Sequence, residues 1–166
     1  MLQPPDNFHI SAAVGWLELG NPLEASAELE KITPSLRFDP HVLSVRQDIY
    51  WHLKKWDEVD TIARVLLELQ PGEPGHWTNL AFCARRKTNG SLPEAKEILL
   101  KAADLFPKEY LIFYNLCCYE SQLGNLTQAK EWLDKAYALG DRKHLQNLVQ
   151  NDSDLEPLRK KFNLSP

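Results

Sequence analysis

The sequence is poor in the residues that favour β-strands. Valine, isoleucine and threonine together occupy 17 of its 166 positions, whereas leucine and alanine occupy 40. Branching at Cβ restricts side-chain rotamers in a helix, while unbranched side chains keep more of their freedom. Glycine is scarce as well, with seven residues, and eleven prolines punctuate the chain. This composition predicts an all-α protein with helices separated at prolines, and the length favours a single domain over residues 1–166.

The sequence also lacks long apolar runs and an excess of positive charge. No stretch of about 18 apolar residues is present, so we expect no membrane span. The segment Met1–Asp6 has no basic stretch followed by an apolar one, so we expect no secretory signal. A net charge of −4 and a pI near 5.7 argue against a nucleic-acid partner. The three cysteines, an odd number without metal-type spacing, predict free thiols in a reducing cytoplasm.

Motifs for catalysis and for metal binding are missing. We find no G-x-S-x-G, phosphate-binding loop, H-E-x-x-H or dinucleotide fingerprint. The five histidines are scattered and form no i, i+4 pair. Cys117 and Cys118 are adjacent in a predicted helix and would point about 100° apart, so we expect no bond between them. Cys118 is the candidate for a reactive thiol, but no base or cation flanks it in sequence. We therefore expect a protein that is not an enzyme and holds no metal or cofactor.

The positive signal is an internal repeat. Its anchors recur at intervals of 34, 36 and 34 residues and are Ala25, Val59, Ala95 and Ala129. A turn residue stands five positions before each anchor, at Gly20, Lys54, Gly90 and Gly124. A period of this length is typical of stacked helix–turn–helix units. We expect four units, approximately at residues 6–39, 40–71, 72–107 and 108–141.

The third and fourth units carry the most complete pattern. The third reads Trp77-x2-Leu80-Ala81 and then Ala95-x3-Leu99; the fourth reads Phe113-x2-Leu116-Cys117 and then Ala129-x3-Leu133. These residues resemble the signature of the tetratricopeptide repeat family, W-x2-L-G-x2-Y…A-x3-F…P. The resemblance implies a right-handed α-solenoid of about four repeats. The stretches 114–124 and 152–158 are similar to a bacterial subset of the family, which suggests a bacterial source.

Capping residues predict where the helices begin and end. Asn21 before Pro22 predicts an N-cap, Ser91-x-x-Glu94 is a capping box, and Gly140 is placed as a C-terminal cap. The expected helices are 7–19, 22–33, 40–54, 57–69, 74–88, 92–105, 108–123, 126–139, 142–150 and 154–162. Small residues at the repeat positions should lie where paired helices cross, because two backbones can approach closely only there.

The last predicted helices, within residues 142–162, have one apolar and one charged side. Their apolar residues are Leu145, Leu148, Val149, Leu155, Leu158 and Phe162. The last repeat of a solenoid requires a polar outer face, so we interpret this segment as a C-terminal cap. The alternative is a helix that docks on a partner.

The resemblance implies that the first helix of each repeat lines a concave ligand groove. Projecting that face gives Trp51, Asn79, Phe82, Arg85, Arg86, Tyr114, Asn115 and Cys118 as candidate peptide-binding residues. Asn79 and Asn115 occupy equivalent positions, and their amides could hold a peptide backbone. The alternative is that these two asparagines tie neighbouring helices together. We expect the polar atoms along this face to be free.

These features predict a non-catalytic scaffold that binds a protein or a peptide. The adjacent arginines Arg85 and Arg86 favour an acidic or C-terminal peptide. An alternative function is a cytosolic chaperone for a specific client, such as a secreted protein. The sequence does not distinguish a monomer from a weak homodimer, and the partner stays unidentified.

Overall fold

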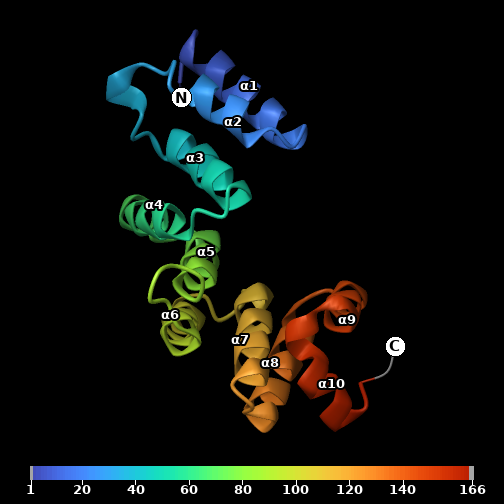
Figure 1. The fold of residues 1–166 in the computed structure, drawn as a ribbon. Helices are drawn as coiled ribbons and strands as arrows, with labels where there is room; N and C mark the ends of the chain where they lie inside the picture. Colours follow the sequence, from blue (N-terminus) through green and yellow to red (C-terminus); the bar gives the residue numbers. More distant parts are fainter. Residues whose placement is uncertain (1, 165–166) are drawn as a thin grey trace. The chain divides into compact units, whose positions relative to one another are not determined.

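The computed structural model describes residues 2–164 as an all-helical protein. Over these residues it contains no strand (Figure 1). The α-helices are α1 (Asp6–Glu18), α2 (Pro22–Leu29), α3 (Pro40–His52), α4 (Trp56–Leu69), α5 (Pro74–Ala84), α6 (Leu92–Leu105), α7 (Tyr110–Gln122), α8 (Leu126–Leu139), α9 (Arg142–Asn151) and α10 (Glu156–Phe162). Two short 3-10 helices are η1 (Pro34–Leu36) and η2 (Ser153–Leu155). The predicted fold class is confirmed, and each predicted helix corresponds to one α-helix.

Two helices end four residues earlier than the sequence predicted. Helix α2 ends at Leu29 instead of near residue 33, because Pro34 disfavours the helical conformation for Thr33 before it. The Thr33 backbone is extended, and its N–H and hydroxyl donate to the Asp6 carboxylate at 2.6 and 3.0 Å. Helix α5 ends at Ala84 instead of near residue 88, and Asn89 beyond it has a left-handed φ of 56°.

A left-handed residue closes the first helix of three repeats. These residues are Gly20, Lys54 and Gly124, with φ of 73°, 57° and 82°. The Lys54 N–H donates to the carbonyl of Trp51 at 3.0 Å, and the Lys55 N–H to that of Tyr50 at 2.9 Å. This pair of bonds is a Schellman cap, which satisfies carbonyls that the helix end leaves unpaired. Lys54 is therefore a lysine in a conformation that favours glycine.

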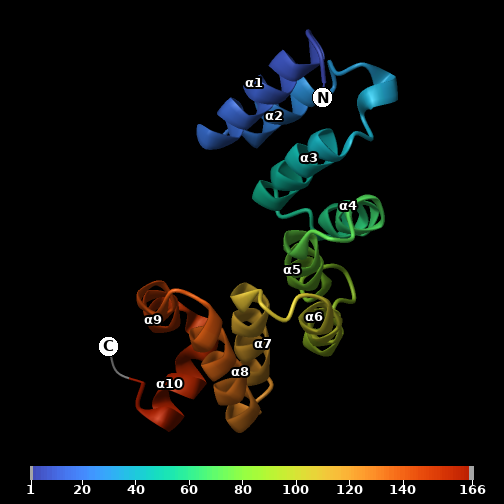
Figure 2. The ribbon, with the colours of Figure 1, turned by 180° about the vertical axis from the view of Figure 1, so that it is seen from behind.

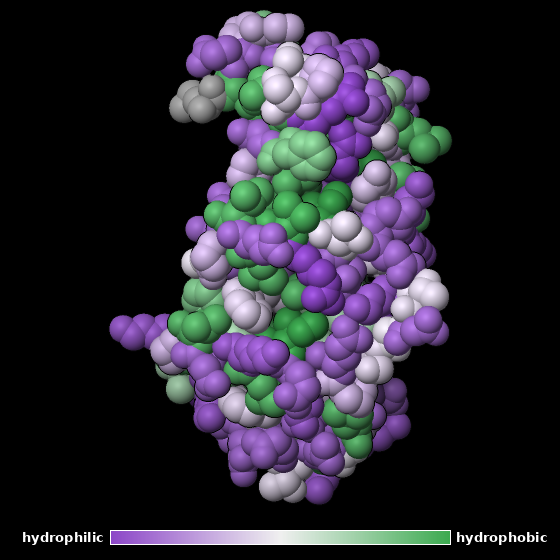
Figure 3. Space-filling model, turned by 90° about the vertical axis from the view of Figure 1, so that its left-hand side faces the viewer, coloured by the Kyte–Doolittle hydropathy of each residue, from purple (hydrophilic) through white to green (hydrophobic). Residues whose placement is uncertain are grey.

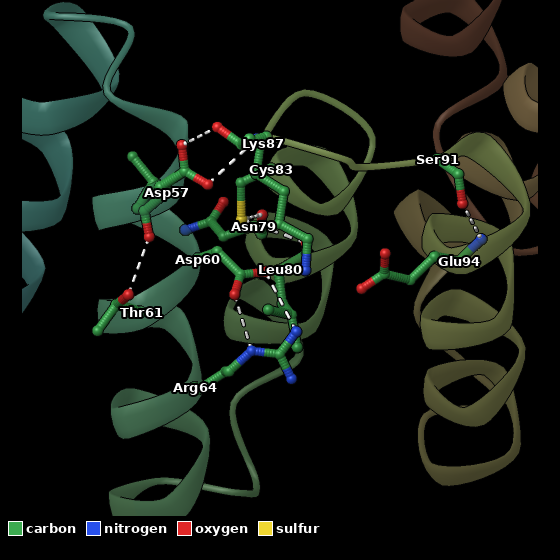
Figure 4. Close-up of polar contacts among 12 residues, drawn as sticks. Asp57, Asp60, Thr61, Arg64, Asn79, Leu80, Cys83, Lys87, Ser91 and Glu94 are labelled. Carbon is green, nitrogen blue, oxygen red and sulfur yellow. Dashed lines mark hydrogen bonds and ion pairs between the residues drawn. The ribbon is translucent and has the colours of Figure 1, made fainter.

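The predicted caps have mixed outcomes. The capping residue Ser91 is confirmed, since its hydroxyl accepts a hydrogen bond from the Glu94 N–H at 3.2 Å (Figure 4). Asn21 is the N-cap residue of α2, with Pro22 at the first helical position, but its side chain makes no capping hydrogen bond. Gly140 does follow α8 but is extended, with φ −103° and ψ 173°. A Cβ at Gly140 would lie 2.7 Å from the ring of Tyr110, so close packing and not a left-handed turn favours glycine there.

The described residues divide into two compact units. The N-terminal unit is drawn from Met1–His76 and Arg86–Asn89, and the C-terminal unit from Trp77–Arg85 and Gly90–Pro166. Each unit has its own apolar core. The prediction of one domain stays a prediction.

The small residues of the repeat lie where the helices pack most closely. In the N-terminal unit, Ala13 and Ala25 are fully buried where α1 packs against α2. In the C-terminal unit, Cys117 and Ala129 are fully buried where α7 packs against α8. Added volume at such positions could not be absorbed without moving a helix, so the repeat register is the one that the sequence predicted.

The C-terminal segment is part of the core of its unit. Leu145, Val149, Leu155 and Leu158 are at most 1% exposed and belong to the same cluster as the core of α5 to α8. Figures 1 and 2 both show α10 beside α8, consistent with the contacts between these two helices. The predicted cap is therefore confirmed, and its apolar side is not available to a partner.

Candidate functional site

The predicted binding residues of the C-terminal unit lie against the chain's own cap. Tyr114 is buried, and its hydroxyl donates to a carboxylate oxygen of Asp152 at 2.9 Å. The Cys118 thiol, also buried, donates to the same oxygen at 3.5 Å. Burial is the main cause that raises the pKa of the Tyr114 hydroxyl, and the neighbouring Cys118 and Asp152 act in the same direction. Both predicted residues thus hold the segment after α9.

Arg85 is engaged in the same way. Its guanidinium forms an ion pair with Asp154 at 3.0 Å and lies 5.2 Å from the centre of the Tyr119 ring. The Gln122 amide donates to the second oxygen of Asp154. Arg85 was predicted to bind an acidic group of a peptide ligand. In the structure it binds the carboxylate of Asp154 of the same chain.

The two asparagines of the predicted groove are not free either. The Asn115 amide donates to the carbonyl of Leu111, one turn earlier in α7, at 2.9 Å. Asn79 is half-buried in α5 and has partners of its own; its backbone carbonyl accepts from the Cys83 thiol at 3.0 Å (Figure 4). Phe82, on the same helix, is half-buried. The expectation of free polar atoms is wrong for Arg85, Tyr114 and Asn115, because local and cap contacts compete for these groups.

The remaining predicted residues belong to the N-terminal unit and gather around Trp56. The rings of Trp51 and Trp56 meet edge to face with centres 5.5 Å apart. The guanidinium of Arg86 lies 5.8 Å from the centre of the Trp56 ring, within the range of a cation–π interaction. All three side chains are half-buried.

Acidic residues of α4 fasten the segment that carries Arg86 to the N-terminal unit. The Asp57 carboxylate accepts hydrogen bonds from the Thr88 N–H and hydroxyl at 3.1 and 2.8 Å. The buried Asp60 lies between Arg64 and Lys87, at 2.8 and 3.3 Å (Figure 4). The two carboxylates and the two cations, Arg64 and Lys87, balance in charge. The contacts of these carboxylates to Lys87 and Thr88 stabilise the turn after α5.

The thiols of Cys117 and Cys118 are poorly suited to nucleophilic chemistry. Burial raises the pKa of Cys117 to about 12, with a further contribution from the Asp152 carboxylate. The pKa of Cys118 is raised well above its usual value for the same two reasons. A thiol in this state holds its proton at neutral pH and is a poor nucleophile. Residues 2–164 also contain no cluster of three or more histidine, cysteine or acidic side chains that could hold a metal ion.

The N-terminal unit contains an apolar pocket that the sequence analysis missed. Its volume is about 570 Å³. The lining residues are Glu30, Arg37, Phe38, Leu43, Arg46, Tyr50, Glu58, Thr61 and Ile62. Leu43 and Ile62 are nearly buried and pack together at its base, while Phe38 is 75% exposed. Figure 3 shows hydrophobic side chains between hydrophilic ones on the face that carries η1 and α4.

The pocket exists because one link between repeats is long. Residues 30–39 join α2 to α3. The corresponding links are shorter, with residues 70–73 between α4 and α5 and residues 106–109 between α6 and α7. The longer link includes η1 and supplies Arg37 and Phe38 to the pocket wall. A link that is longer than the corresponding links of the other repeats is often part of a binding site.

Charged side chains stand at one edge of the pocket. Arg46 and Arg37 share the carboxylate of Glu30, at 2.8 and 3.0 Å. The hydrogen bond from Arg46 is the main cause that lowers the pKa of Glu30. Two guanidinium groups therefore share the Glu30 carboxylate, and the exposed Glu58 also lines the pocket, so its charged side chains balance in number.

Solved structures share the fold. MamA from Desulfovibrio magneticus RS-1 has a TM-score of 0.70 at 17% identity, over 98% of this chain and 94% of that one. PilW, a widely conserved type IV pilus biogenesis factor, has a TM-score of 0.69 at 19% identity, over 98% and 77%. TTC0263, a thermophilic TPR protein from Thermus thermophilus, has a TM-score of 0.68 at 18% identity, over 95% and 88%. The chain has the tetratricopeptide-repeat fold.

This TPR fold agrees with the predicted α-solenoid of helix–turn–helix repeats. No family model and no curated protein sequence matches the chain. No helix within residues 2–164 is long and apolar enough to cross a bilayer. At these levels of identity the neighbours establish the fold of the chain, and its function has to be argued from its own surfaces.

The pocket could not be predicted from the inner faces of the first helices alone, because residues of the link before α3 and of α4 also line it. Leu43 and Tyr50 of the lining lie in the second repeat, but nothing in their spacing predicts a cavity. The available signal was the extra length before Pro40, which marks the one irregular link between repeats.

Proposed function

We propose that this protein is a non-catalytic scaffold that binds another protein or a peptide, and that the pocket of the N-terminal unit receives the partner's anchor side chain. The pocket carries the proposal. It combines an apolar base of Leu43, Tyr50 and Ile62 with the exposed ring of Phe38. Its volume of about 570 Å³ lies within the range of roughly 300–1,000 Å³ that is typical of ligand pockets.

The charges at the edge of the pocket favour a particular kind of peptide. Arg46 contacts Glu30 through one guanidinium nitrogen, and its remaining N–H groups could donate to a carboxylate on the ligand. The preferred ligand is therefore a segment with a large apolar side chain and an acidic residue close to it in sequence. Apolar anchors supply most of the affinity in such interfaces, and charges supply selectivity.

The same proposal includes a cytoplasmic location and the absence of nucleic-acid partners. Free thiols at Cys83, Cys117 and Cys118 support a reducing compartment. The net charge of −4 supports a protein partner in preference to a nucleic acid. A chaperone function would use the same surface on an incompletely folded client.

Selection of peptides from a random display library tests the pocket. We expect the enriched peptides to share an aromatic or large aliphatic residue near an aspartate or glutamate. Thr61→Glu places an anionic side chain at the pocket edge, where it repels an acidic ligand, and Phe38→Ser removes an exposed wall; each should weaken binding at least about tenfold.

Leu105→Ser is the matched control, because Leu105 is 58% exposed and lies in the C-terminal unit. Its affinity for the selected peptides should equal that of the wild type. Equal binding by all three variants would show that the pocket is not the site. A co-purified partner that is insoluble without this protein would favour the chaperone, and a folded, soluble one the scaffold.

A further inference from the structure

Helix α1 carries an exposed apolar stripe on the side opposite its core. Its core residues are Asp6, Ile10 and Ala13. Phe8, Ala12, Gly15 and Leu19 recur at helical spacing on the other side. Phe8 is 64% and Leu19 77% exposed, and a Cβ placed on Gly15 would meet no atom within 4 Å. We call these four residues the outer stripe.

Nothing within the described N-terminal unit covers the outer stripe. Helix α1 packs against α2 and α3, and Figures 1 and 2 both show α2 beside it. Leu23, in the first turn of α2, adds a further apolar side chain that is 69% exposed. At the other terminus, by contrast, α9 and α10 cover the last repeat and present lysines to solvent.

At the Phe8 end of the outer stripe, Glu28 is paired with His9 and Lys31, whereas the charge beside Leu19 and Leu23 is negative and unpaired. No lysine or arginine precedes Lys31 in the sequence. Glu18 lies beside Leu19, and Glu24 lies beside Leu23. Both carboxylates are exposed and have no ion-pair partner among the described residues.

We propose that the outer stripe of α1 docks a basic amphipathic helix of a partner protein. Apolar residues of that helix would pack between Phe8 and Leu19, where the small Ala12 and Gly15 allow a close approach. Lysine or arginine on the flanks of the partner helix would pair with Glu18 and Glu24. A second copy of this chain fits poorly, because a symmetric pairing of two stripes would bring these uncompensated carboxylates together. This surface is separate from the pocket of the N-terminal unit.

Two designed helical peptides of identical apolar face test the proposal. One carries lysine on both flanks of a leucine stripe, and the other carries glutamate there. We expect the fluorescently labelled lysine peptide to bind the full-length protein, and the glutamate peptide to bind at least about tenfold more weakly. The double variant Glu18→Lys/Glu24→Lys should reverse this preference.

The apolar contribution is tested with Phe8→Ser/Leu19→Ser, which should abolish binding of the lysine peptide. All substituted residues are exposed, so thermal melting should match the wild type. Leu105→Ser/Leu139→Ser, at positions 58% and 44% exposed in the C-terminal unit, is the matched control and should bind normally. Thr61→Glu, which disrupts the pocket, should also bind the lysine peptide normally, which separates this surface from the pocket.

Three results would overturn the proposal. The first is equal binding of both peptides, because the surface would then have no charge selectivity. The second is unchanged binding by the Phe8→Ser/Leu19→Ser variant. The third is a wild-type dimer in sedimentation analysis that this variant loses, which would identify a second copy of the chain as the occupant.

Discussion

The hydroxyl of Tyr114 donates a hydrogen bond of 2.9 Å to the carboxylate of Asp152, a residue 38 positions later in the chain. This bond joins the first helix of the fourth repeat to the segment after α9. The Cys118 thiol donates to the same carboxylate oxygen. A residue that looked like part of a ligand groove thus holds the cap in place.

Replacing Tyr114 by phenylalanine should destabilise the protein. The variant keeps the ring but removes the donor, and a hydrogen bond to a charged acceptor contributes about 1.5–3 kcal/mol. Chemical denaturation measures the difference in the free energy of unfolding. An unchanged denaturation midpoint for Tyr114→Phe would mean that the cap does not depend on this bond.

Lys54→Gly should stabilise the protein by about 0.5–1 kcal/mol. Lys54 has a φ of 57°, and a side chain with a Cβ is disfavoured in the left-handed conformation. Glycine relieves this cost, although it also gives the unfolded chain more freedom. The matched control is Lys55→Gly, because Lys55 has a φ of −85° and no such cost to relieve. A lower melting temperature for Lys54→Gly would contradict the assigned turn.

Gly140→Ala should destabilise the protein by about 1–3 kcal/mol, the usual range for overpacking. The added Cβ would lie 2.7 Å from two ring carbons of Tyr110, and the ring would have to move. Gly75→Ala tests the specificity of this effect. Gly75 lies in α5 with no atom within 4 Å of the added Cβ, so alanine there should be neutral or stabilising. Thermal melting of both variants by circular dichroism provides the comparison.

Ala129→Leu tests the packing register of the repeats. Ala129 is fully buried in α8 at its contact with α7. Three added carbons cannot be accommodated there without displacing a helix, and we expect a loss of about 1–3 kcal/mol. Ala138→Leu, on an exposed position of the same helix, should change the unfolding free energy little. Similar denaturation midpoints for both variants would contradict the register.

Glu30 should make the stability of the N-terminal unit weakly dependent on pH. The hydrogen bond from Arg46 lowers the pKa of Glu30 below its usual value of 4.5. The folded state therefore gains stability above pH 4.5 and loses it as the pH falls through the folded-state pKa. The stability difference between wild type and Glu30→Gln should narrow on acidification. Because the Glu30 side chain is 53% exposed, the effect should be small and sensitive to salt.

Helix positions and repeat register followed from the sequence because they depend on local chemistry. Alanine or valine at intervals near 34 residues, with unbranched apolar residues between them, predicts where two helices can cross. The capping bond of Ser91 to Glu94 spans three residues and was predicted for the same reason. The apolar side of residues 142–162 likewise predicted that this segment is a buried cap.

The candidate sites depended on contacts between residues far apart in the chain. The side chains of Tyr114 and Arg85 could bind a peptide, but in the folded protein they form a hydrogen bond with Asp152 and an ion pair with Asp154. The pocket beside Phe38 arises from a link of irregular length, whose path depends on the helices around it. Periodicity in the sequence reports which side of a helix is apolar, and only tertiary packing decides what, if anything, covers that side.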